Sequence, residues 1–351
     1  MTLARSQVPR PLAGPSANRW LGPAAFGVAF VLVVILGLAA ATAAFVAERA
    51  TAPRVAARAF PARLVQHREN TPFVTQSESG GWKQPSAIAV LGGRWFVLDT
   101  GNNRILEVDA AGNIVAVLDR SVDERMVLRN AMAIDSDGSY LYVANSGASE
   151  IIVLEPGGRV VSVLPLTKVE PEDLARPRPI GLAVTSNGEL LVSDADNQRV
   201  LRYDRNGGLL QAIGSGTRAA GAVGFNSPGG LTLDGNGNIY VVDILNGRVV
   251  QLSQEGAYLR QLGRLGDTAG TLSRPKDVAV DRVGNVYVSD SLLASVQVFG
   301  PQGEYLGFIG RQAAGDRDSK SMFKAPAGLT IADGSLRVVD RLEGLFVFQL
   351  P

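Results

Sequence analysis

The sequence of 351 residues contains no cysteine and only one histidine, His67. Without cysteine the chain can form no disulfide bond, thiolate metal site or cysteine nucleophile. A single histidine makes a multi-histidine zinc site impossible within one chain, and it disfavours a Ser-His-Asp nucleophile site, which would need the same residue. Only three tryptophans are present, so a repeat built on Gly-His and Trp-Asp motifs cannot be assembled.

A six-fold repeat is the main feature that is present. Each copy contains a short apolar stretch, a glycine-bearing turn and a second apolar stretch. The acidic or amide residues that end the second stretch are Asp99, Asn145, Asp194, Asp243, Asp290 and Asp340, at spacings of 46, 49, 49, 47 and 50 residues. The residues that precede the first stretch keep the same step and are Pro85, Asn130, Pro179, Pro228, Pro275 and Pro326. A period of roughly 40 to 50 residues with all-strand content is typical of a propeller blade. The sequence therefore predicts an all-β, six-bladed β-propeller of four-stranded antiparallel blades over residues 63–351.

The motif Pro-x-Gly-Leu-x-Leu followed by Gly-x-Ile-Tyr-Val-x-Asp, clearest in residues 228–243, resembles the NHL repeat family. The resemblance extends over about residues 63 to 351, and blade two departs from it with Asn130 and Asn145. It implies a six-bladed propeller, but no single activity, because that fold hosts binding modules, sensors and several enzymes.

Closure of the ring needs a strand from the start of the propeller. The chain ends at Pro351, directly after the third strand of blade six, and an open blade edge would expose unpaired backbone groups. Counting back from Pro85 by the spacing in the other blades reaches residues 64 to 69. We therefore expect strand 63–67 to close the propeller, in preference to residues 73–75.

The front of the chain is apolar. Residues 26–46 form an uncharged run that is long enough to span a bilayer as a helix, and Trp20 lies where an interfacial aromatic anchor belongs. The sequence predicts a cytoplasmic tail over 1–19, a transmembrane helix or signal anchor over 20–47, and a tether over 48–62. A cleaved signal peptide is the alternative, although its apolar region is usually shorter.

Arginines flank the apolar run on both sides, so the positive-inside rule does not orient it. A lone N-terminal anchor usually exports the domain on its C-terminal side, and membrane-tethered NHL-like propellers are commonly sensor or binding ectodomains. We therefore expect a single-pass membrane protein whose propeller is periplasmic or extracellular.

Two rings of polar residues are expected at one end of the propeller, where the turn between strands two and three meets the connection to the next blade. The first contains Asp99, Asp194, Asp243, Asp290 and Asp340, which we interpret as structural turn residues. The second is basic and contains Lys83, Arg129, Arg178, Arg274 and Lys324. It predicts a positive funnel that attracts an anionic ligand or a partner segment. Lys276 and Asp277 are the only charged pair at the head of an inner strand; they are the best candidates for channel residues, and a local ion pair is the alternative.

The function expected from these features is a non-catalytic, membrane-anchored scaffold or sensor that binds a protein, such as a membrane-complex subunit, at the basic face. An enzyme is the less favoured alternative: a calcium-dependent lactonase or esterase-like hydrolase, with Asn130, Asn226 and Asp277 as the weak metal candidates. No catalytic residue, metal or cofactor is otherwise assigned. Nucleic acid is not an expected partner. Residues 1–70 hold 8 Arg and 2 Glu, which leaves the propeller 26 basic and 31 acidic residues, a net charge of −5.

Overall fold

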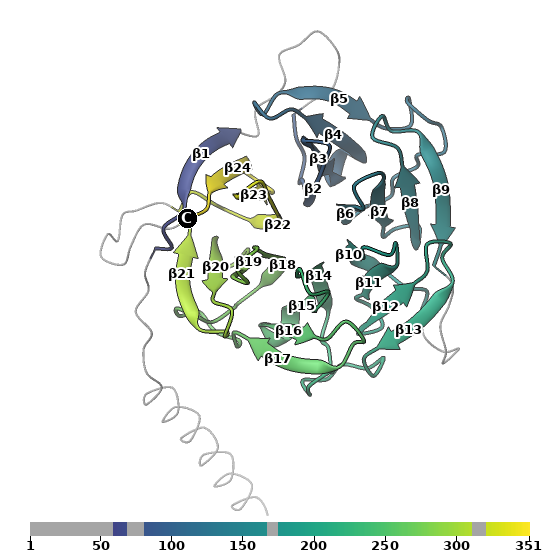
Figure 1. Ribbon diagram of the computed structural model, residues 1–351. Helices are drawn as coiled ribbons and strands as arrows, with labels where there is room; N and C mark the ends of the chain where they lie inside the picture. The colour runs from purple at the N-terminus through teal and green to yellow at the C-terminus, as the bar shows by residue number, and fades with distance from the viewer. Residues whose placement is uncertain (1–58, 69–80, 167–174, 311–320) are drawn as a thin grey trace, which may run out of the picture. The chain divides into compact units, whose positions relative to one another are not determined.

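The structure is a computed structural model that describes residues 59–68, 81–166, 175–310 and 321–351. These residues form six four-stranded antiparallel sheets arranged radially around a centre (Figure 1), which confirms the predicted all-β, six-bladed propeller. The predicted tail and transmembrane helix, and the tether as far as residue 58, lie outside the described residues. Within the described ranges, no helix is long and apolar enough to cross a membrane.

Each blade runs outward from the channel to the rim in chain order. The strands of the first three blades are β2 (Ala87–Leu91), β3 (Arg94–Asp99), β4 (Arg104–Val108) and β5 (Ile114–Leu118); β6 (Ala133–Ser136), β7 (Leu141–Asn145), β8 (Glu150–Leu154) and β9 (Val160–Pro165); β10 (Pro179–Val184), β11 (Leu190–Asp194), β12 (Arg199–Tyr203) and β13 (Leu209–Ile213). Their second strands are completely buried apart from the exposed Arg94 at the start of β3, because both faces pack against neighbouring blades.

Blades four to six follow the same plan, and a strand from the start of the chain completes the last one. Their strands are β14 (Pro228–Leu233), β15 (Ile239–Asp243), β16 (Arg248–Leu252) and β17 (Tyr258–Leu262); β18 (Pro275–Val280), β19 (Val286–Asp290), β20 (Ser295–Phe299) and β21 (Tyr305–Ile309); β22 (Pro326–Ala332), β23 (Ser335–Asp340), β24 (Gly344–Gln349) and β1 (Arg63–Arg68). Single 3₁₀ turns, η1 (Thr100–Asn102) and η2 (Ile244–Asn246), follow the second strands of blades one and four.

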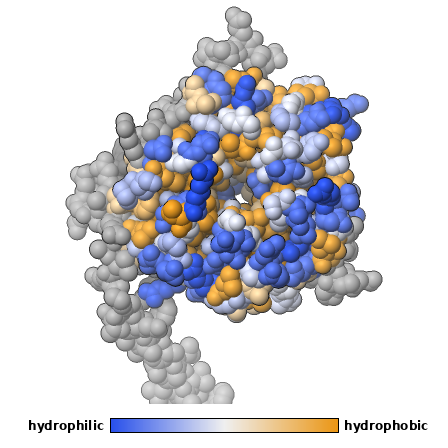
Figure 2. Space-filling view, in the orientation of Figure 1, coloured by the Kyte–Doolittle hydropathy of each residue, from blue (hydrophilic) through white to orange (hydrophobic). Residues whose placement is uncertain are grey.

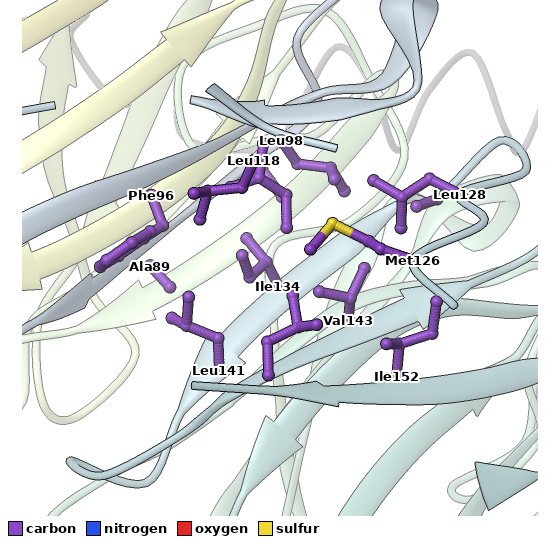
Figure 3. Close-up of a cluster of buried hydrophobic side chains, with 14 of the residues drawn as sticks. Ala89, Phe96, Leu98, Leu118, Met126, Leu128, Ile134, Leu141, Val143 and Ile152 are labelled. Carbon is purple, nitrogen blue, oxygen red and sulfur yellow. The ribbon is translucent and has the colours of Figure 1, made fainter. Parts of the chain in front are cut away.

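The hydrophobic core is divided among the six interfaces between neighbouring blades. Figure 3 shows the cluster between blades one and two, where Phe96 and Leu98 of β3 face Ile134 and Val143 of β6 and β7. Equivalent clusters occupy the other five interfaces. Because a blade buries its faces only against its neighbours, its stability depends on closure of the whole ring.

The ring closes by antiparallel pairing of β1 with β24, at the rim of blade six (Figure 1). Register runs from Arg63 opposite Gln349 to Arg68 opposite Leu345. The spacing argument places this strand at residues 64 to 69, one residue from where it lies. The end of the predicted tether is also packed: the buried Phe60 donates its backbone N–H to the carbonyl of Phe308 and meets the ring of Tyr287 edge to face.

Candidate functional site: the central channel

The inner strands of all six blades line a central cavity of about 570 Å³. Figure 2 shows one face of the ring, which is hollowed toward this centre. Most of the lining is small or apolar, and the charged residues that line it are Asp135, Arg178, Lys276, Asp277 and Arg341. A concave cavity with a few convergent polar groups is the usual form of a small-molecule site, and polar atoms make up most of the surface exposed in this one.

The two predicted polar rings are joined by hydrogen bonds in every blade. The side chain that ends each second strand accepts a backbone N–H from the segment entering the inner strand; the donors are Lys83, Arg129, Arg178, Asn226, Arg274 and Lys324. In blade four the donor is Asn226, one residue before the Ser227 that aligns with the ring by sequence. The residues that end the second strands thus hold the backbone at this end of the channel, and they do so through the backbone N–H groups of the basic residues rather than through their side chains.

The aspartates also bind side chains across their own hairpins. In blades one, three and four the Asp accepts a hydrogen bond from Arg Nε, as between Asp99 and Arg104 at 2.7 Å. Blade two exchanges the roles, because the Asn145 amide donates to Glu150 at 2.7 Å. This reversal keeps the hydrogen bond across the hairpin and accounts for Asn145 in place of aspartate in blade two.

The inner strands approach one another most closely near this end of the channel. The register is irregular in β10, β14, β18 and β22, and the irregular segment contains a glycine in blades three, four and six but Lys276 and Asp277 in the fifth blade. A Cβ on Gly181 would lie 2.2 Å from the Gly229 carbonyl oxygen, and a Cβ on Gly230 would lie 2.1 Å from Asp277 Oδ1. Glycine is required there because neighbouring backbones, and in blade five the Asp277 carboxyl group, occupy the space of a side chain.

Asp277 is wedged between blades four and six. Its Oδ1 accepts the backbone N–H of Val278 at 2.9 Å, and its Oδ2 accepts that of Leu329, on β22, at 2.8 Å. Burial raises the pKa of Asp277 to about 7, which outweighs the two hydrogen bonds that favour the charged form. Negative charge on Asp135 raises that pKa further.

Asp135, on β6, is the second channel carboxyl group, and sequence reasoning missed it. Its Oδ2 accepts the backbone N–H of Val184, on β10, at 2.8 Å. Burial raises the pKa of Asp135 to about 6, with a smaller contribution from the charge on Asp137. A signal was present in the sequence: the residues at this position in the other blades are all small or uncharged, namely Ala89, Ala183, Thr232, Ala279 and Thr330.

The two carboxyl groups therefore differ in proton occupancy near neutral pH. Burial raises the pKa of both groups, to about 6 for Asp135 and about 7 for Asp277, so both titrate near neutral pH and Asp277 holds its proton to the higher pH. The difference between the two pKa values follows from the burial of both groups and from the repulsion that the charge of Asp135 exerts on Asp277. Two titratable groups whose surroundings separate their pKa values can serve as an acid and a base in the same cavity.

The predicted basic ring divides into two sets. Among these described residues Arg178 is the only ring member that lines the cavity, whereas Lys83, Arg129, Arg274 and Lys324 are exposed outside it; the separately predicted pair Lys276 and Asp277 also lines the cavity. Arg178 is neutralised by Asp196, with Nε 2.6 Å from Oδ1, and Lys324 pairs with Glu343. In the described part of the chain Lys276 and Asp277 form no ion pair, so the local-pair interpretation is wrong. Asp277 instead binds backbone N–H groups, and burial, with the charges on Arg341 and Arg274, lowers the pKa of Lys276.

Arg341 is the other channel residue that the sequence interpretation missed. It follows Asp340 directly, at a position where the other blades have Thr100, Ser146, Ala195, Ile244 and Ser291. Thr100 and Ser146 reach the next blade, since Thr100 Oγ1 donates to the Ala131 carbonyl at 2.8 Å and Ser146 Oγ donates to the Pro179 carbonyl, whereas Ser291 Oγ donates to the Arg274 carbonyl of its own blade. Arg341, in the last blade, lines the cavity.

The weak metal candidates are not brought together. Of Asn130, Asn226 and Asp277, only Asp277 lines the cavity. Among the described residues no group of three or more His, Asp or Glu side chains could hold a metal ion. The oxygen donors that a calcium site needs are therefore not assembled by the residues that the sequence suggested.

The pKa of Asp277 predicts a pH-dependent stability. Because the folded pKa of about 7 lies above the ordinary value of 3.8, the folded state retains a proton that the unfolded chain has lost between these values. We expect the free energy of unfolding to fall on the order of 1 to 3 kcal/mol as the pH rises from about 4 to 7, allowing for screening by channel water. Urea unfolding across this range should show a smaller fall in Asp277→Asn. Equal slopes in the two proteins would contradict the assigned pKa.

Comparison with known proteins places the channel in context. Residues 89–227 match the family model described as SMP-30/Gluconolactonase/LRE-like region. This part of the chain is similar to that family. The match extends from blade one to the start of blade four, less than half of the chain, and it includes Asp135 but not Asp277. No curated protein sequence matches the chain. The NHL-like interpretation of the motifs stays a prediction.

Solved structures show the same fold at low sequence identity. A gluconolactonase from Xanthomonas campestris is 17% identical, with a TM-score of 0.58 over 85% of this chain and 98% of that one. A streptogramin B lyase is 15% identical, with a TM-score of 0.55 over 82% and 98%. Virginiamycin B lyase from Staphylococcus aureus is 11% identical, with a TM-score of 0.54 over 82% and 99%. At these identities the likeness shows the propeller fold alone.

Proposed function

We propose that the protein is a hydrolase that opens a small lactone or ester in its central channel. The observation that carries this proposal is the pair of channel carboxyl groups, Asp135 and Asp277, with raised and unequal pKa values. The match to the gluconolactonase-like family model and the likeness to a gluconolactonase support the hydrolase over the non-catalytic scaffold.

The two groups have complementary roles in this proposal. Ionised Asp135 accepts a proton from the water that attacks the carbonyl carbon. Protonated Asp277 donates its proton to the ester oxygen as the carbon–oxygen bond breaks, which gives a hydroxy acid or an alcohol and an acid. After this step Asp135 is protonated and Asp277 is ionised, and proton exchange with channel water restores the starting state. Backbone hydrogen bonds from Val184 and Leu329 hold the two carboxyl groups in place.

A divalent cation, expected for the calcium-dependent form of this activity, does not fit the donors that the described residues present. Only two carboxyl groups line the cavity, and each already accepts a backbone N–H from the next blade. No step is therefore assigned to a metal.

The test is turnover of a panel of small lactones and esters by the full chain. We expect Asp277→Asn and Asp135→Asn each to lower kcat about 10²- to 10⁴-fold, because each removes one proton-transfer group. The pH profile of the wild type should be bell-shaped, with limbs near the two pKa values of about 6 and 7.

The matched control is Asp204→Asn. Asp204 accepts backbone N–H groups from Asn206 and Gly208 in an exposed turn, so its substitution removes a carboxylate outside the channel. Asp204→Asn should retain wild-type turnover. Absence of turnover across the panel, full activity in both channel variants, or a strict calcium requirement would each contradict the proposed mechanism.

A further inference from the structure

The mouth of the channel contains two cations from neighbouring blades. Lys276 begins the inner strand of blade five, and Arg341 lies in the turn of blade six; both are half-buried and both line the cavity. They are close enough for the charge on Arg341 to lower the pKa of Lys276. Two like charges held near one another in a partly desolvated place are unfavourable unless an anion joins them.

Neither cation forms an ion pair among the described residues, and the charge on Asp290 offsets only part of the effect of burial and of the neighbouring arginines on the pKa of Lys276. Arg178 and Lys324, at the same end of the propeller, are paired with Asp196 and Glu343, whereas no ion pair involves Lys276 or Arg341. The Nε atom of Arg341 is buried and makes no hydrogen bond within the described part of the chain. A buried donor without a partner is unfavourable, and because Arg341 lines the cavity, an anion bound there would satisfy it.

Both cations break the repeat. The residue after the turn aspartate is uncharged in the other five blades, and the position of Lys276 and Asp277 is filled elsewhere by small or apolar pairs such as Ala327-Gly328. These departures occur in blades that are adjacent in the ring, and both project to the same mouth. The structure of the blades does not require either charge, because four blades fold without any charge at these positions.

We propose that Lys276 and Arg341 bind an anionic group of the substrate, a carboxylate or a phosphate, at the mouth of the channel. A guanidinium group and an ammonium group together provide directional donors and a point charge, which suits either anion. Lys276 and Arg341 line the same cavity as Asp135 and Asp277, so a small molecule whose anionic group the cations hold lies in the cavity that contains both carboxyl groups. The inference rests on the proposed function: the substrate would be a lactone or ester that carries a carboxylate or a phosphate.

The experiment measures binding of inorganic phosphate and of malonate to the full chain by isothermal titration calorimetry. We expect the wild type to bind at least one anion, and Lys276→Met and Arg341→Met each to weaken it at least tenfold. Lys324→Met is the matched control, since it removes an exposed cation that is already paired with Glu343 and lies outside the cavity. Binding of phosphate alone assigns a phosphorylated substrate. Binding of malonate alone assigns a substrate with a carboxylate, and binding of both anions allows either group.

Absence of binding to the wild type, or equal affinity in all four proteins, would overturn the inference. Thermal unfolding checks that each variant is folded, and Arg341→Gln replaces Arg341→Met if the latter is not. The two proposals fail separately. Hydrolysis of neutral lactones without anion binding would contradict the anion site and leave the proposed hydrolase function standing. Anion binding at Lys276 and Arg341 without any hydrolysis would contradict the hydrolase function and leave the anion site standing.

Discussion

Replacing Asp194 by alanine is expected to lower the free energy of unfolding by about 3 to 5 kcal/mol. Asp194 is fully buried, and it accepts hydrogen bonds from Arg199 Nε at 3.1 Å, Asn197 Nδ2 at 2.8 Å and the backbone N–H of Arg178 at 3.0 Å. Alanine would leave the buried Arg199 guanidinium without this carboxylate and would release the segment that enters the inner strand of blade three. Urea unfolding measures the loss.

The control for Asp194→Ala is the double variant in which Arg199 is also replaced by methionine. Removing both charges leaves no uncompensated buried ion, so the double variant should be more stable than Asp194→Ala alone. A loss below about 1 kcal/mol for Asp194→Ala, or a double variant less stable than the single one, would show that the ion pair does not hold the turn.

Deleting residues 63–68 should produce the second large effect, a loss of cooperative unfolding with a lowered midpoint. The deletion removes β1, the partner of β24, and exposes an edge at the rim of blade six. Each lost backbone hydrogen bond contributes about 0.5 to 1.5 kcal/mol, and the exposed edge favours self-association. Circular dichroism during thermal unfolding, with light scattering, follows both changes.

A deletion of equal length within the predicted tether, residues 49–54, is the matched control. It shortens the chain by six residues without removing any residue of the described sheets. An identical midpoint for the two deletions, with no self-association of the first, would mean that closure by β1 contributes little to the stability of the ring.

Much of the architecture could be predicted because its signals are local and repeated. Turn residues such as Asn187-Gly188 end one strand and begin the next, and Gly188 has a φ of 83°, which a glycine adopts without strain. Six copies of such a unit reveal the blade number by their spacing alone. The position of the closing strand followed from the same arithmetic, since a missing fourth strand at one end of the chain must be supplied from the other.

The candidate site was less accessible to sequence reasoning. Asp277 stands out because a charged pair breaks a run of small or apolar pairs, and the alternative of a local ion pair with Lys276 does not hold. Asp135 and Arg341 break the repeat in the same manner at other positions, so comparing every repeat position, rather than the strand heads alone, would have revealed them.

The sequence by itself determined the repeat, the number of blades and the turn aspartates, because each depends on neighbours within one copy of about 50 residues. Only the tertiary structure decided which charges meet. Asp135, Asp277, Lys276 and Arg341 come from blades two, five and six, and they converge because the ring brings its inner strands to one axis. Their pKa values and their partners follow from desolvation and charge in that shared cavity, which no single repeat contains.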